Sequence, residues 1–150
     1  MTLSEEIQIH ANKEAVWAVI SDIKNAQQTV SGIQSLEILE KPVHGLVGLK
    51  WKESRKMFGK IAFETMWITE AVENKCYKVE AVSHGSEYLS TVTIQEDNEH
   101  CILRMTFKTT PFSTGAKVMS GIMSGLLKKL MKKLIKQDLQ DLKSAIEAKG

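Results

Sequence analysis

The chain has 150 residues, the length of one ordinary domain, and its composition is 43% hydrophobic and 25% charged. These values exclude collagen-like, low-complexity and disordered classes, and no apolar run reaches the roughly 18 residues of a membrane span. The first residues contain neither a basic leader nor an apolar stretch, so we expect no secretory signal and a cytoplasmic location. Cys76 and Cys101 are far apart in the chain and are expected to be reduced thiols on packed strands.

The net charge of +2 is unevenly distributed along the chain. Residues 1–112 carry 12 basic and 15 acidic side chains, whereas residues 113–150 carry 8 lysines and 3 acids. The basic segment contains no arginine and no interleaved aromatic residues beyond Phe112 just before it. This composition does not favour a nucleic-acid partner.

Two kinds of element are predicted before residue 30. Residues 3–10 alternate apolar and polar side chains, which is typical of a half-buried strand. Asn12 then has the position of a helix N-cap, and apolar residues follow at helical spacing up to Asp22. A second short helix is expected over residues 24–29.

From Ile33 the apolar period falls to two residues, which predicts strands. Turn signals divide residues 33–110 into about six strands. These signals are Lys41-Pro42, Gly45 to Gly48, Gly59, Glu73-Asn74, His84-Gly85 and Asp97-Asn98. Because connections this short leave no room for crossover helices, the sheet is predicted to be antiparallel.

A long amphipathic helix is predicted after Pro111, with apolar residues every three or four positions from Val118 to Ile146. The apolar face drifts around the helix axis, which indicates a strongly curved sheet wrapped around the helix or a bend at Gly121 and Gly125. The two glycines are equally compatible with close backbone approach. Opposite the apolar face lie Lys129, Lys132, Lys133, Lys136 and Lys143.

The lysines of residues 49–57 indicate which side chains of that strand point inward. Three lysines share one face, and lysine is almost never fully buried. The opposite face, which is predicted to be internal, carries Trp51, Glu53, Arg55 and Met57. A phase shifted by one residue is the alternative and would reverse every side chain. Lys52, Lys56, Phe63 and Trp67 would then exchange faces with the internal set.

A hairpin loop at Gly59-Lys60 would set the register of the next strand. Arg55 would then lie opposite Glu64 and form an internal ion pair with it. In the same register Glu53 faces Met66, and Trp51 faces Ile68.

The element order resembles that of the START-like, or SRPBCC, superfamily, also described as polyketide cyclase/dehydrase-like. The resemblance is carried by Ile7-x-Ile9-x-Ala11-x-x-Glu14-x-Val16-Trp17-x-x-Ile20-Ser21-Asp22, by Trp67-Ile68-Thr69-Glu70 and by Leu142-Lys143-x-x-Ile146-Glu147. It implies one α+β helix-grip domain over residues 1–150. In such a domain a curved antiparallel sheet of about seven strands surrounds a long C-terminal helix, and two short helices follow the first strand. The chain departs from the family pattern at Gln27-Gln28-Thr29-Val30, where a Trp-Pro pair is often found.

The expected ligand-binding residues combine apolar walls with a few polar groups, as ligand cavities do. From the strands they are Trp51, Glu53, Arg55, Glu64, Met66, Ile68, Tyr77, Tyr88 and Met105. By resemblance, the long helix closes the cavity, which adds Met119 and Met123. Methionine adapts to irregular ligands, although it equally serves as core filling.

The resemblance implies binding or transport of a small hydrophobic or amphipathic ligand, such as a lipid, an isoprenoid quinone or a polyketide-like molecule, with no cofactor. One alternative is a cyclase or dehydratase in which Glu64 and Arg55 take part in proton transfer, with a tyrosine as proton donor. Another is a protein-partner-binding module.

The histidines at positions 10, 44, 84 and 100 show no metal-ligand spacing to each other or to the cysteines, so no metal site is expected. No motif of a hydrolase, a nucleotide-binding protein or a zinc protease is present. The lysine face of the long helix is expected to meet solvent or to dock transiently on an anionic membrane.

Overall fold

The computed structural model describes residues 1–57, 59–83 and 85–149, with the side chains of residues 118–124 left out of that description. The elements follow the predicted order of strand, short helices, strands and long helix. They are β1 (Thr2–Ile9), α1 (Lys13–Ile20), the 3₁₀ helix η1 (Ile23–Asn25), α2 (Ala26–Thr29), β2 (Ile33–Glu40), β3 (Lys50–Met57), β4 (Lys60–Val72), β5 (Cys76–Ser83), β6 (Ser86–Asp97), β7 (His100–Pro111) and α3 (Thr114–Lys149).

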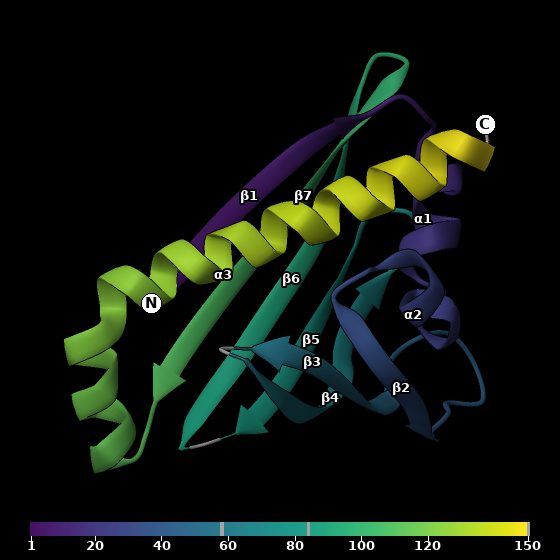
Figure 1. The fold of residues 1–150 in the computed structure, drawn as a ribbon. Coiled ribbons are helices and arrows are strands. Elements are labelled where there is room, and N and C mark those ends of the chain that lie inside the picture. The colour runs from purple at the N-terminus through teal and green to yellow at the C-terminus, as the bar shows by residue number, and fades with distance from the viewer. Residues whose placement is uncertain (58, 84, 150) are drawn as a thin grey trace.

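The strands form one antiparallel sheet in the order β1-β7-β6-β5-β4-β3-β2, as the short connections predicted. β1 pairs with β7, so the first strand lies beside the last and the others follow as successive hairpins. Two tight turns use asparagine in the left-handed region, Asn74 with φ 63° and Asn98 with φ 57°, a conformation that asparagine tolerates. Figure 1 shows the curved sheet with α3 running across one of its faces.

The register of β3 and β4 differs from the predicted one. Met57 lies opposite Lys60, so Arg55 is paired with Ala62 and Glu53 with Glu64. The expected pairing of Arg55 with Glu64 is therefore wrong, as is that of Trp51 with Ile68, because Trp51 faces Met66. The difference amounts to two residues, and side chains alternate with a period of two, so the internal face is unchanged.

Helix α1 begins where the sequence predicted. The side-chain oxygen of Asn12 accepts a hydrogen bond from the Ala15 backbone N–H at 2.8 Å. Val16 and Ile20 are buried on the inner side of the helix. This helix packs against α3 and, with η1 and α2, covers one end of the sheet.

Helix α3 is held to the rest of the fold along its C-terminal half. Its buried side chains recur at helical spacing and are Ile135, Leu139, Leu142 and Ile146. Lys143 Nζ donates a hydrogen bond to the Gln8 carbonyl at 2.6 Å, which ties this end to β1. α3 packs mainly against β1, β7 and α1.

The N-terminal part of α3 bends away from the direction of the rest of the helix (Figure 1). A bend in this helix was one of the two explanations for the drifting apolar face. A Cβ added at Gly125 would meet nothing within 4 Å, so close packing is not the reason for glycine at that position.

Among the described residues, none of the helices is long and apolar enough to cross a membrane.

Cys76 and Cys101 are separate thiols, as predicted. Burial raises the pKa of the Cys101 thiol, and the nearby carboxylates of Glu96 and Glu14 act in the same direction. A thiol of raised pKa is protonated at neutral pH, so Cys101 behaves as a small apolar side chain in the core.

Replacing Leu139 by alanine tests the anchoring of α3. Leu139 is 1% exposed, so Leu139→Ala should lower the free energy of unfolding by about 2–5 kcal/mol in urea titrations. The matched control is Leu126→Ala on the same helix, where the side chain is 64% exposed and a change within about 0.5 kcal/mol is expected. Similar losses in the two variants would contradict this description of the helix.

Candidate functional site

A cavity of about 930 Å³ lies between the sheet and the helices. Its volume is within the range of small-molecule sites, about 300–1,000 Å³. Eight of the residues expected from the sequence line it. They are Trp51, Glu53, Arg55, Glu64, Met66, Tyr77, Tyr88 and Met105.

Three expected residues are not placed in the cavity wall. Ile68 is packed in the core, 1% exposed, and does not line the cavity, although its partner on β5, Val79, does. Met119 and Met123 lie outside the described side chains. α3 instead contributes Leu127, Met131, Leu134, Ile135, Asp138 and Leu142.

Asp138 is a residue that the sequence analysis did not identify. It lies four residues after Leu134 and four before Leu142, on the apolar side of α3. An acidic residue within an apolar stripe at that spacing was the available signal, because a buried carboxylate requires a partner.

That partner is Arg55 on β3. Its Nη1 donates to Asp138 Oδ1 at 3.0 Å, and Nη2 lies 2.9 Å from Asp138 Oδ2. The Arg55 Nε donates to Glu53 Oε2 at 3.1 Å. Trp51 Nε1 donates to the other oxygen of Glu53 at 3.0 Å. We call Glu53, Arg55 and Asp138 the Arg55 network; it joins β3 to α3 across the cavity.

Burial and neighbouring charges shift the pKa values of Asp138 and Arg55 in opposite directions. Burial raises the pKa of the Asp138 carboxyl, although the Arg55 guanidinium opposes that rise. For Arg55, burial disfavours the charged form, yet Asp138 and Glu53 outweigh it and raise its pKa. Arg55 therefore stays cationic between two carboxylates.

A second set of hydrogen bonds fixes the turn before β2 to α3. Ser31 donates from its backbone N–H and from Oγ to Asp141 Oδ2, at 2.9 and 2.7 Å. Burial alone would raise the pKa of Asp141, but the bonds from Ser31 and Gln137 outweigh it and lower that pKa. A Cβ on Gly32 would lie 3.0 Å from Arg55 Nη1, so this position favours glycine.

The two tyrosines of the cavity wall have different environments. Tyr77 is 6% exposed, and its hydroxyl donates to the Ile20 carbonyl at 3.0 Å. Burial raises its pKa, so this hydroxyl is a neutral group engaged with the backbone of α1. The Tyr88 ring stacks on Phe107 with centroids 5.7 Å apart. Its pKa is raised by burial and then by the charge of Glu64, so this hydroxyl is also neutral at physiological pH.

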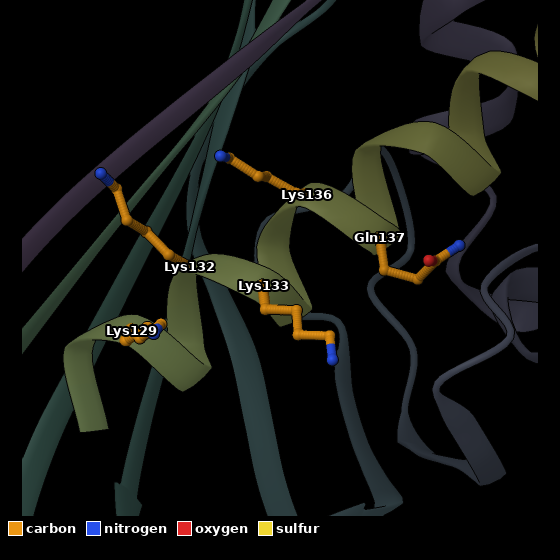
Figure 2. A pocket seen from close by; sticks show the side chains of 5 residues that line it. All are labelled: Lys129, Lys132, Lys133, Lys136 and Gln137. Carbon is orange, nitrogen blue, oxygen red and sulfur yellow. The ribbon is translucent and has the colours of Figure 1, made fainter. Parts of the chain in front are cut away.

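A surface groove of about 400 Å³ lies on the outside of α3. It is lined by Lys129, Lys132, Lys133, Lys136 and Gln137, which we call the lysine groove. Figure 2 shows Lys132 and Lys136 extending to one side of the helix and Lys133 to the other. Lys132 Nζ lies 3.6 Å from Glu5 Oε1 on β1.

Comparison with known families identifies one match. Residues 1–147 match the sequence family described as polyketide cyclase / dehydrase and lipid transport. A search of curated proteins finds no match.

Solved structures with the same fold cover nearly the whole chain. A structure from Thermus thermophilus has a TM-score of 0.84 at 16% identity, covering 100% of this chain and 99% of that one. A START superfamily protein from Mycobacterium smegmatis has a TM-score of 0.82 at 14% identity, with 99% of both chains covered. The Zhui aromatase/cyclase from Streptomyces has a TM-score of 0.83 at 14% identity, covering 98% of this chain and 93% of that one. At these identities the likeness establishes the helix-grip fold.

Substitution of the two tyrosines separates their roles. Tyr77→Phe leaves the buried Ile20 carbonyl without its donor and should cost about 1–3 kcal/mol of unfolding free energy. Tyr88→Phe should cost less than about 1 kcal/mol, because its ring packing on Phe107 is retained. Thermal and urea unfolding of both variants provide the measurement, and a larger loss for Tyr88→Phe would reverse the assignment.

Proposed function

Because the chain belongs to the polyketide cyclase/dehydrase and lipid transport family, we propose that it binds and carries one small hydrophobic or amphipathic molecule in its internal cavity. The observation that carries the proposal is a cavity of about 930 Å³ with mainly apolar walls. Apolar burial provides about 25 cal/mol per Å², before the cost of ordering the ligand. Lipids, isoprenoid quinones and polyketide-like molecules fit this description.

The polar groups of the cavity favour a particular kind of ligand head. The Arg55 network contains one cation and two carboxylates, and Glu64 adds a third acidic side chain to the lining. Arg55 directs Nε, Nη1 and Nη2 to protein carboxylates. The site therefore suits a head that donates hydrogen bonds, such as a hydroxyl or phenol, better than a carboxylate.

Catalysis by the same cavity is the second proposal, since the family includes polyketide cyclases. Glu64 would act as the general base on an enolisable carbonyl and Tyr88 as the proton donor. The observation that supports this is that both side chains line the same cavity. The Glu64 charge raises the pKa of Tyr88, so the hydroxyl keeps its proton at neutral pH. A small or collapsed cavity would have favoured a protein-partner module, and a cavity of about 930 Å³ does not match that expectation.

A carrier has to load and release its ligand, and we propose that it does so at an anionic membrane. The lysine groove offers four lysines, of which Lys132 is also paired with Glu5. A lysine near an anionic surface contributes about 1 kcal/mol. Leu126 is 64% exposed and lies one turn before Lys129 on α3. Leu127 and Met131 of the same stretch line the cavity, so docking would bring the cavity wall close to the lipid.

The free thiols agree with the expected cytoplasmic location, which stays a prediction.

A pair of adjacent positions on β4 tests ligand binding. Ala62 lines the cavity, whereas Ile61 is 56% exposed on the other face of the sheet. Ala62→Phe should fill part of the cavity and weaken binding of a fluorescent naphthol or naphthalene probe at least tenfold, roughly 1.4 kcal/mol. Ile61→Phe is the matched control and should leave the affinity unchanged. Equal affinities for Ala62→Phe and the unsubstituted chain would contradict the proposed site.

Glu64→Gln distinguishes carrying from catalysis. The substitution removes the carboxylate and nearly conserves the shape of the side chain. A carrier should retain its ligand within a few-fold, whereas an acid/base enzyme should lose turnover by about 10²–10⁴-fold and retain binding. Ligand titration and product analysis by mass spectrometry on the same preparation measure both outcomes.

Flotation with vesicles tests the membrane contact. Vesicles containing phosphatidylglycerol should carry the chain at low salt, and those of phosphatidylcholine alone should not. Glutamine at Lys129, Lys132, Lys133 and Lys136 should abolish flotation. The control has glutamine at four exposed lysines elsewhere, Lys24, Lys41, Lys60 and Lys75, and should still float. If both quadruple variants lose flotation equally, net charge rather than the groove is responsible.

A further inference from the structure

His10 and His100 are in contact although 90 residues separate them in the chain. Their Nδ1 atoms are 3.1 Å apart, and the rings meet edge to face with centroids 4.4 Å apart. The sheet register accounts for this: Ile9 lies opposite Cys101, so antiparallel pairing places His10 and His100 next to each other beyond that pair. We call these two residues the histidine pair.

The separation of the two nitrogens matches that of two ligands on one metal ion. Imidazole nitrogens bind transition metals at about 2.0–2.1 Å. With 3.1 Å between the nitrogens, the angle at the metal is roughly 98°. This value lies between the right angle of square-planar or octahedral coordination and the wider tetrahedral angle.

We propose that the histidine pair chelates one divalent transition-metal ion through the two Nδ1 atoms. Imidazole is a ligand suited to copper, nickel and zinc. His10 is exposed and His100 is half-buried, so an ion reaches the pair from solvent without any opening of the fold. Metal binding replaces the hydrogen bond that the two rings otherwise share.

Two acidic residues and one lysine lie near the pair. Glu147 on α3 accepts a hydrogen bond from the His10 backbone N–H at 3.4 Å and is paired with Lys143. Asp97 lies opposite His100 in the register of β6 and β7. Within the described part of the chain no three histidine, cysteine or acidic side chains form a closed metal site. Water therefore completes the coordination sphere, and the bound ion exchanges with solvent.

Metal at this position would join the end of β1 to the start of β7. The last turns of α3 dock on the same place, where Lys143 Nζ donates to the Gln8 carbonyl. Since the two histidines are adjacent only in the folded chain, an ion that binds them stabilises that state. Neither histidine lines the internal cavity, so metal binding at the pair does not depend on the ligand proposed there.

The test uses the full chain without an affinity tag. Titration calorimetry with zinc and nickel chlorides should show one ion per chain, and copper should bind more tightly than either. His10→Ala and His100→Ala should each weaken binding at least roughly tenfold and abolish the metal-dependent rise in Tm. His44→Ala is the matched control, because His44 is exposed elsewhere and should leave both measurements unchanged.

Electron paramagnetic resonance of the copper-loaded chain gives a second measurement. The spectrum should show coupling to two imidazole nitrogens, and to one in either single variant. His100→Gln, which retains a polar side chain, serves if His100→Ala fails to fold. Binding that persists at full strength in the single variants, equal binding of magnesium, or no saturable binding would overturn the proposal.

Discussion

The position of α3 relative to the sheet is the constraint on which the rest of this structure depends. Leu139, Leu142 and Ile146 anchor the C-terminal half of the helix in the core, and Lys143 ties it to β1. The helix packs mainly against β1, β7 and α1, so the strands β3 to β5 are not covered by close helix packing. Large apolar walls are thus held apart, and a cavity of about 930 Å³ results. An empty cavity of this size is costly in a close-packed interior, which supports the proposal that it holds a ligand.

The Arg55 network is the second set of contacts that positions α3 relative to the sheet. A guanidinium bound to Glu53 and to Asp138 connects β3 with α3 through side chains that are far apart in the sequence. Buried ion pairs contribute little net stability, and we infer that this one instead fixes the position of α3 relative to β3. In this chain the network also places carboxylates at an otherwise apolar site. The same residues therefore set the width of the cavity and the polarity that a ligand head would meet.

The sequence predicted the fold well because periodicity and turn residues are local signals. The capping side chain of Asn12, the hairpin turns and the long apolar stripe of α3 were all recognisable from short windows. The internal face of β3 followed from the exposure of lysine. The β3–β4 register was two residues off, because one glycine near a turn does not specify which residues close the hairpin.

The parts of the site that depend on tertiary contacts could not be predicted in the same way. Asp138 lines the cavity because of where α3 lies in the folded chain, which short sequence windows do not show. For the same reason Arg55 pairs with Asp138 rather than with the expected Glu64. The hydroxyl of Tyr77 is engaged by the Ile20 carbonyl, which no local pattern reveals. The histidine pair depends on strands from opposite ends of the sequence, so its spacing along the chain carried no information.

Native mass spectrometry of the untagged protein purified from its own host measures whether the internal cavity holds a ligand. We expect a complex heavier than the bare chain by the mass of one small apolar molecule, which is released on denaturation. If the chain is bare under native conditions and also takes up no apolar probe, the cavity is not a binding site.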